Sequence, residues 1–202
     1  MSNAPWGGKR KRQMNDSSSD DEATKMYSEI NHVYFNGDVT MESAYKLNKC
    51  LRSVAQEIKR TAFETAAPVI PIYLHITTYG GYIMAAWSVV DCISGLGVPV
   101  YSVVDGVAAS AGTLISLAAQ KHFIQPNAYM MVHELSSSVW GSMSAIECEA
   151  QNLKNMMEHI RKFYVAKTKF EKDELDAILL KDVYWNAEEC ISRGLADLLY
   201  KV

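Results

Sequence analysis

The chain alternates between short apolar runs and longer stretches with helical spacing, and this alternation is the strongest constraint on its fold. Apolar runs of strand length occur at residues 33–35, 69–76, 98–104, 122–125 and 128–133. Apolar residues recur at helical spacing over 41–60 and 82–94. Strands and helices in this order are joined by crossover connections, which makes the strands parallel. We therefore expect an α/β fold of repeated β-α-β units.

Two turns that contain glycine, at residues 77–81 and 105–112, each follow an expected strand. The carboxyl ends of parallel strands share one edge of a sheet, and ligands bind beyond that edge. A helix of small residues is expected to begin at Ser110, directly after the strand. Earlier in the chain, residues 61–68 are expected to form a loop. The pattern thus places both turns at the edge where a site would form.

The second half of the chain is expected to be mainly helical. A long helix over about 142–168 follows a polar, extended segment at 136–141. The remaining expected elements are a short helix, an extended segment, a last helix ended by Gly194 and a final strand, at 173–180, 182–185, 187–193 and 195–200.

The long helix carries apolar residues at alternating intervals of four and three. They are Ile146, Ala150, Leu153, Met157, Ile160 and Tyr164. Such a heptad-like seam suits packing against another long helix. The seam could pack within the chain, but few other segments are long enough to cover it. We therefore favour a partner subunit as its cover.

Composition and charge argue against several classes of function. The 202 residues suffice for one α/β domain with a core. A net charge of -3 argues against nucleic-acid binding, which usually needs a basic surface. No apolar run reaches about 18 residues, so we expect no membrane-spanning helix and no membrane partner.

The cysteines and histidines lack the spacing of a metal site. Zinc ligands usually come in short pairs, and the four cysteines at positions 50, 92, 148 and 190 contain none. We therefore expect no metal and mostly buried, reduced thiols. That redox state fits the cytoplasm or the interior of an organelle or host cell.

Residues 1–25 differ from the rest of the chain. They contain a basic cluster at 9–12 and a polar, acidic run at 17–22, with few apolar residues. We expect a disordered tail here and one domain over 26–202. The basic cluster matches nuclear-import or anion-binding patterns, but such short matches are common, and a solvated tail is the preferred interpretation.

Ser110 stands where a serine nucleophile would be placed. It follows a strand and opens a helix, and its neighbours Ala108, Ala109, Ala111 and Gly112 are small enough for a sharp turn. The helix N-terminus adds positive potential where an oxyanion would form. Alone, the same residues fit a plain helix start against a sheet equally well.

Three other segments offer the groups that a serine nucleophile needs. His133 ends an apolar strand and is either a general base or a hydrogen-bonded core residue. Asp182 is either the carboxylate that orients it or a surface aspartate, and spacing alone does not show that the two meet. Gly80 and Gly81 form either a tight turn or a backbone donor for a carbonyl oxygen.

Together these segments resemble the Clp protease proteolytic subunit family over about residues 27–199. The four motifs occur in the family's order and at close to its spacing, which is more specific than any one of them. They are the glycine turn at 76–81, the serine motif at 106–112, the histidine strand at 126–133 and the aspartate segment at 181–189, which 194–197 closes.

The resemblance implies a fold of the ClpP/crotonase type with a protruding handle helix. It implies Ser110 as nucleophile, His133 as general base and Asp182 as the residue that orients it. The oxyanion donors would be the backbone N–H groups of Gly81 and Ala111.

The resemblance also implies a binding site for an extended peptide. Gly80 and Tyr82 would flank the peptide on one side, and Ser136, Ser137 and Trp140 on the other, by strand addition. The substrates would be unfolded polypeptides.

An assembly and a partner follow from the same resemblance. The chain would form stacked heptameric rings around a chamber, through interlocked handle helices. A separate AAA+ unfoldase would use ATP, so no cofactor is expected in this chain.

The sequence departs from the family at four places. Residues 77–79 read Thr-Thr-Tyr where the family favours Asn-Ser-Pro, and Ala111 replaces the usual methionine, although its implied role needs only the backbone. Glu134 and Leu135 replace Gln-Pro. Residues 1–25 lack the apolar start of the family's axial segment.

Three alternatives remain open. The chain could be a non-catalytic ring subunit, although no triad residue is lost. It could be a soluble Ser–Lys hydrolase of the signal-peptide-peptidase type, a group that usually has membrane segments. It could be a crotonase-fold acyl-CoA enzyme, for which Glu134 is the obvious acid–base carboxylate and the serine turn would have no purpose.

Overall fold

The computed structural model describes residues 25–201, so the predicted tail up to residue 24 lies outside the described part of the chain. The strands are β1 (Lys25–Glu29), β2 (His32–Asn36), β3 (Ile72–Thr78), β4 (Val100–Ala109), β5 (Lys121–Ile124), β6 (Tyr129–Met131), β7 (Tyr184–Trp185) and β8 (Leu198–Leu199). The helices are α1 (Met41–Thr65), α2 (Ile83–Gly95), α3 (Ala111–Leu117), α4 (Met143–Lys167), α5 (Lys172–Leu179) and α6 (Ala187–Arg193).

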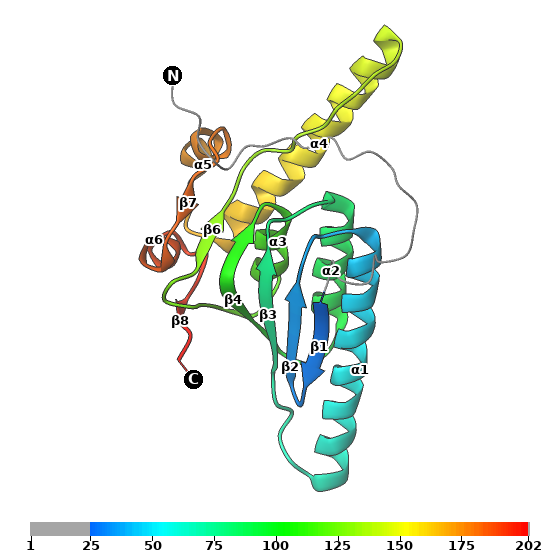
Figure 1. The fold of residues 1–202 in the computed structure, drawn as a ribbon, viewed down its shortest axis with the longest axis vertical. Helices are drawn as coiled ribbons and strands as arrows, with labels where there is room; N and C mark the ends of the chain where they lie inside the picture. The colour runs from blue at the N-terminus through cyan, green and yellow to red at the C-terminus, as the bar shows by residue number, and fades with distance from the viewer. Residues whose placement is uncertain (1–24, 202) are drawn as a thin grey trace, which may run out of the picture.

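One sheet forms the centre of the molecule (Figure 1). Its strands run in the order β1-β2-β3-β4-β5-β8, and all neighbours from β2 to β8 are parallel. Strand β6 pairs in parallel with the end of β4 and antiparallel with β7. The expected α/β fold of β-α-β units is therefore confirmed.

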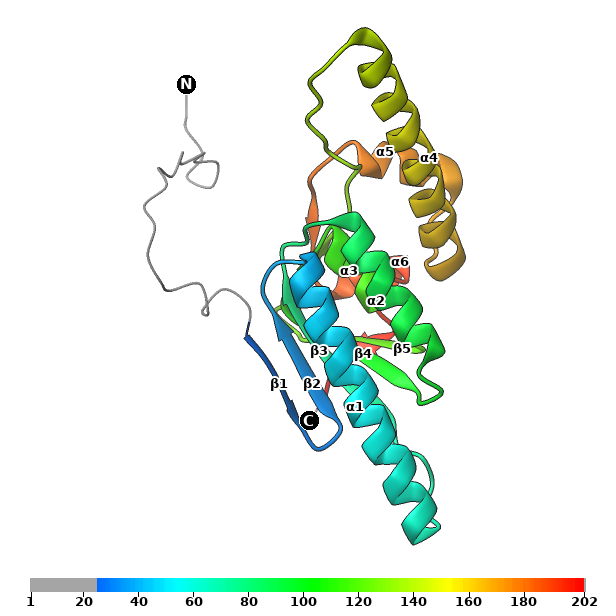
Figure 2. The ribbon, with the colours of Figure 1, turned by 90° about the vertical axis from the view of Figure 1, so that its right-hand side faces the viewer.

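Helices α1 and α2 lie side by side over one face of the sheet (Figure 2). Helix α1 contributes Leu47 and Leu51 to the core, and β3 contributes Leu74 and Ile76, all of them fully buried. Burial of such apolar side chains supplies the main driving force for folding. The cysteines agree in part with expectation: all four are free, Cys92 and Cys190 are buried, and Cys148 is exposed.

Several predicted boundaries are wrong, each for a local reason. The loop expected over 61–68 is helical to Thr65, where Ala66 ends α1 in a left-handed conformation with φ 51°. Ile58 is the last buried residue of α1, so the end of the helix projects into solvent and shows no apolar period. Strand β4 continues to Ala109, beyond the expected 98–104, because β6 pairs with its end.

Other differences concern short elements. Strand β1 was not predicted, although it pairs antiparallel with β2 and stacks Tyr27 on Tyr34. The strand expected over 195–200 shortens to β8, and that over 128–133 shortens to β6. Helix α6 has the predicted bounds because Asn186 caps its start and Gly194 ends it with φ 77°.

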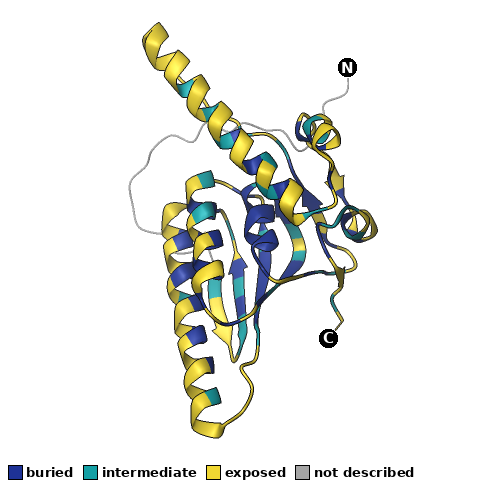
Figure 3. Ribbon diagram, turned by 180° about the vertical axis from the view of Figure 1, so that it is seen from behind, coloured by how far each residue is buried: buried dark blue, intermediate teal, exposed yellow. Residues whose placement is uncertain are grey.

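The seam of α4 divides into two halves (Figure 3). Met157, Ile160 and Tyr164 are buried against the rest of the chain. Ile146 and Ala150 are exposed on the half that projects from the body. The expectation that a partner covers the seam is therefore wrong for the second half, which the chain covers itself.

Candidate active site

Ser110 occupies a strained turn between β4 and α3. Its backbone has φ 54° and ψ -125°, a combination that costs a residue other than glycine about 1–3 kcal/mol. The Ser110 N–H donates to the carbonyl of Met131 at 2.8 Å, which ties the turn to β6. Ser110 is thus the residue before the helix, not its first residue as the sequence predicted, and α3 begins at Ala111.

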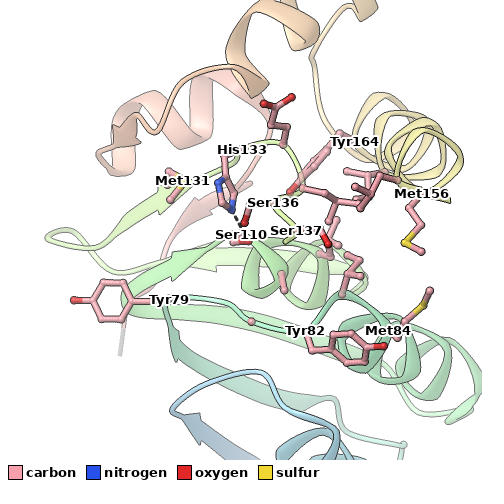
Figure 4. A pocket seen from close by; sticks show the side chains of 18 of the residues that line it. Tyr79, Tyr82, Met84, Ser110, Met131, His133, Ser136, Ser137, Met156 and Tyr164 are labelled. Atoms are coloured by element: carbon pink, nitrogen blue, oxygen red, sulfur yellow. Dashed lines mark hydrogen bonds between the residues drawn. The ribbon is translucent and has the colours of Figure 1, made fainter. Parts of the chain in front are cut away.

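His133 lies against this serine. Its Nε2 is 2.7 Å from Ser110 Oγ, within hydrogen-bonding distance (Figure 4). Its Nδ1 is 3.3 Å from Asp182 Oδ1, and the side chain of Asp182 is 76% exposed. The structure therefore brings together all three residues that the sequence singled out.

The pairing of β6 with β7 explains how Asp182 reaches His133. Met131 lies opposite Tyr184 in the antiparallel ladder. His133 follows Met131 by two residues and Asp182 precedes Tyr184 by two, so extension of the same register places them opposite each other. The sequence spacing could not show this, because it contains no information on which strands pair.

The glycine turn after β3 lies against Ser110. A Cβ on Gly80 would be 2.6 Å from Ser110 Cβ, and φ at Gly80 is +100°. A Cβ on Gly81, where φ is +145°, would be 2.3 Å from the carbonyl oxygen of Val39. Only glycine fits either position, because both the space and the backbone conformation exclude a side chain.

The two expected oxyanion donors also lie at this junction. Gly81 and Ala111 both line the cavity beside Ser110. Within residues 25–201, neither N–H donates a backbone hydrogen bond outside the regular helices and strands. Both groups are therefore suited to donate to a bound carbonyl oxygen.

A cavity of about 540 Å³ opens beside the serine and histidine (Figure 4). Besides the residues already described, its walls contain apolar side chains from α2, α3 and α4. These are Ile83, Met84, Leu114, Leu153, Met156 and Ile160. A cavity that combines apolar walls with a few polar groups can accommodate a hydrophobic side chain of a ligand.

The predicted peptide-binding residues lie at different distances from this cavity. Tyr82, Ser136 and Ser137 line it, and Gly80 lies beside Ser110 without being part of the lining. Trp140 is 96% exposed and is absent from the lining. The extended segment leaves the cavity along α4, where Ser137 donates to Glu149, so its later residues are carried outward.

The apolar lining was missed by sequence reasoning. Leu153 and Ile160 were singled out for their spacing on the long helix, but as parts of an interface seam. Met84 and Met156 gave no signal, because apolar residues on a helix usually indicate burial in a core. Their convergence on one cavity depends on how α2 and α4 pack.

The part of the chain that the structure describes contains neither a metal-binding cluster nor a membrane-spanning helix. Residues 25–201 contain no group of three or more His, Cys, Asp or Glu side chains arranged to hold a metal ion. None of the helices in that range combines the length and the apolar character needed to cross a membrane.

The sheet and the serine–histidine–aspartate arrangement define an α/β protein with the side-chain geometry of a serine hydrolase. A family model described as Clp protease matches residues 17–202. The chain belongs to the Clp protease family.

The chain is similar to two bacterial proteolytic subunits over most of its length. It is 26% identical over 189 residues to "ATP-dependent Clp protease proteolytic subunit 2" of Treponema denticola, covering 93% of this chain and 90% of the relative. It is 29% identical over 170 residues to "ATP-dependent Clp protease proteolytic subunit 1" of Chlamydia muridarum, covering 82% and 83%.

Its fold is that of a solved relative. A ClpP1 mutant from Listeria monocytogenes superposes with a TM-score of 0.74 at 24% identity, covering 86% of this chain and 92% of the relative. The fold and the family together make the chain a Clp-type peptidase subunit.

Proposed function

We propose that the chain is a serine endopeptidase in which Ser110 is the nucleophile, His133 the general base and Asp182 the orienting carboxylate. The observation that carries this proposal is the 2.7 Å contact between His133 Nε2 and Ser110 Oγ at a strained turn. A serine hydroxyl becomes nucleophilic when a base accepts its proton, and this geometry supplies the base.

The proposed reaction proceeds in two half-reactions. Ser110 Oγ attacks the scissile carbonyl carbon while its proton passes to His133 Nε2, and the N–H groups of Gly81 and Ala111 stabilise the resulting oxyanion. His133 then protonates the leaving amine, and the C–N bond breaks to leave an acyl ester on Ser110. Water, deprotonated by His133, attacks the ester and releases the carboxylic acid and free Ser110.

The proposed substrate is an unfolded polypeptide. The apolar cavity beside Ser110 fits a hydrophobic side chain next to the scissile bond, and Tyr82, Ser136 and Ser137 line its mouth. A segment can present one side chain to such a cavity and its carbonyl to Gly81 only when it is locally extended.

The proposed active form is a homo-oligomer of stacked heptameric rings inside a cell. The exposed half of α4 and the fully exposed Trp140 support a subunit contact, because such apolar surface is usually covered. The relatives are described as subunits of ATP-dependent proteases. We propose likewise that a separate AAA+ unfoldase uses ATP and that this chain needs no cofactor.

The direct test is cleavage of an unfolded, fluorescently labelled protein by the purified chain, with a matched serine control. Wild-type protein and Ser53→Ala, a change on the exposed side of α1, are expected to cleave it, whereas Ser110→Ala abolishes cleavage. Equal cleavage by Ser110→Ala contradicts the proposal. An assembled wild type without activity would indicate a non-catalytic ring subunit.

A further inference from the structure

A chain of buried hydroxyl groups connects α4 to the backbone of the nucleophile. Tyr164 Oη lies 2.5 Å from Thr113 Oγ1, and Thr113 Oγ1 lies 2.6 Å from the carbonyl oxygen of Ser110. Thr113 is 0% exposed and Tyr164 2% exposed, so water does not compete for these bonds. The roles proposed above assign no function to these two hydroxyl groups.

The direction of these hydrogen bonds is fixed by chemistry. A carbonyl oxygen only accepts, so the Thr113 hydroxyl donates to Ser110. That hydroxyl has a single proton, so it must accept from Tyr164. Burial raises the pKa of the Tyr164 phenol well above its ordinary value, which keeps the group protonated as a donor.

The accepting carbonyl belongs to the same peptide unit as the N–H of Ala111. A peptide unit is planar, with its C=O and N–H pointing in opposite directions. Hydrogen bonds that fix the Ser110 carbonyl therefore also fix the Ala111 N–H. This N–H points away from the carbonyl, toward the cavity that Ala111 lines. The Thr113 N–H donates to the same carbonyl at 3.0 Å, and the hydroxyl chain is the second restraint.

Tyr164 is itself held firmly at the end of α4. Its carbonyl oxygen accepts from the Thr168 N–H at 2.9 Å and from Thr168 Oγ1 at 2.7 Å. Its ring lines the cavity beside Ile160. Burial of the side chain and its hydrogen bond to Thr113 hold the phenol group in place, so that it can orient the peptide unit.

We propose that Tyr164, acting through Thr113, is a positioning residue for the Ala111 N–H that binds the oxyanion. This inference rests on the proposed function, because it assigns a role within the same reaction. A donor aimed in advance at the oxyanion stabilises the transition state more than the bound substrate. Loss of the restraint should therefore lower kcat and leave KM almost unchanged.

The test compares Tyr164→Phe and Thr113→Val with wild type in steady-state cleavage of a short fluorogenic peptide. One hydrogen bond typically changes an equilibrium about three- to tenfold, so we expect kcat to fall by about that factor, with KM within about twofold. Thr113→Ser retains the hydroxyl and should restore kcat. The double variant should be no slower than Thr113→Val alone, because Tyr164 acts only through Thr113.

A second measurement separates positioning from general damage. A peptide boronate forms a tetrahedral adduct on Ser110 with one oxygen in the oxyanion site. Its affinity should fall by the same factor as kcat in Tyr164→Phe, whereas binding of the cleaved product peptide should not change. Melting temperatures show whether each variant stays folded under the assay conditions, and active-site titration gives its fraction of reactive sites. Tyr45→Phe, on the exposed side of α1, is the matched control.

An unchanged kcat in both Tyr164→Phe and Thr113→Val overturns the inference while the proposed function stands. A raised KM with unchanged kcat also overturns it, because the phenol would then contact substrate instead of positioning a donor. An inactive wild type and an inactive Tyr45→Phe overturn the proposed function, and this inference with it.

Discussion

At the scale of single residues, the site depends on backbone conformations that few side chains permit. Ser110 adopts a positive φ, and Gly80 packs against its Cβ with no space for a side chain. Such strained backbone persists where the surrounding structure holds it in place. The hydrogen bonds of the Ser110 backbone to Met131 and Thr113 hold this conformation in place.

Gly80→Ala should therefore inactivate the protein. The new Cβ would lie 2.8 Å from the carbonyl oxygen of Ala109, in addition to its clash with Ser110. Gly95→Ala is the matched control, since nothing lies within 4 Å of the Cβ added there and alanine should stabilise the end of α2 by up to about 1 kcal/mol. Peptidase activity and melting temperature measure both effects. An active Gly80→Ala would show that the turn does not approach Ser110.

Asp182→Asn should lower kcat less than His133→Ala does. The Asp182 carboxylate is largely exposed and lies 3.3 Å from His133 Nδ1, so water already weakens its interaction with the ring. Loss of the general base should reduce kcat by about 10²–10⁴-fold, and loss of the carboxylate should reduce kcat by a smaller factor. Steady-state kinetics of both variants test this order, which an equal loss in both would contradict.

At the scale of helices and strands, elements with strong local signals were predicted well. Helix α6 has its predicted bounds because Asn186 and Gly194 supply both caps. The end of α1 was missed because its last turns contact nothing that would impose an apolar period. The order of the four motifs indicated Ser110, His133 and Asp182, but their contact depends on strand pairing that no local pattern encodes.

The exposed half of α4 should mediate assembly. Ile146→Asp places a charge within the half of the seam that the chain leaves uncovered, and burial of that charge in a contact would be unfavourable. We expect the oligomer to dissociate at concentrations where wild type stays assembled. Native mass spectrometry measures this, with Glu57→Gln on the exposed side of α1 as control. An oligomer of unchanged stability would exclude this face from the interface.

At the scale of the whole molecule, acid should destabilise the fold through a buried histidine. His122 donates from Nε2 to the carbonyl of Ala119 at 3.0 Å, and its Nδ1 lies 3.4 Å from Asp197 Oδ2. Burial lowers the pKa of His122, and the nearby Asp197 carboxylate opposes that shift only in part. The folded state therefore binds fewer protons than the unfolded state just below the ordinary histidine pKa of about 6.5.

The free energy of unfolding should consequently fall as the pH drops below about 6.5, toward the lowered pKa of His122. His122→Gln removes this titration and should make the decline shallower. Denaturant unfolding at a series of pH values from neutral to mildly acidic measures both slopes. Identical slopes in the two proteins would show that His122 does not contribute.

The measurement that tests the central claim most directly is covalent labelling with a fluorophosphonate, followed by peptide mass mapping. The hydroxyl of an activated serine displaces fluoride from phosphorus and keeps the phosphonyl group. Wild-type protein should carry one label, on Ser110, and His133→Ala should be labelled far more slowly. A folded, assembled wild type that stays unlabelled, or carries its label on another serine, would contradict the claim that Ser110 is the nucleophile.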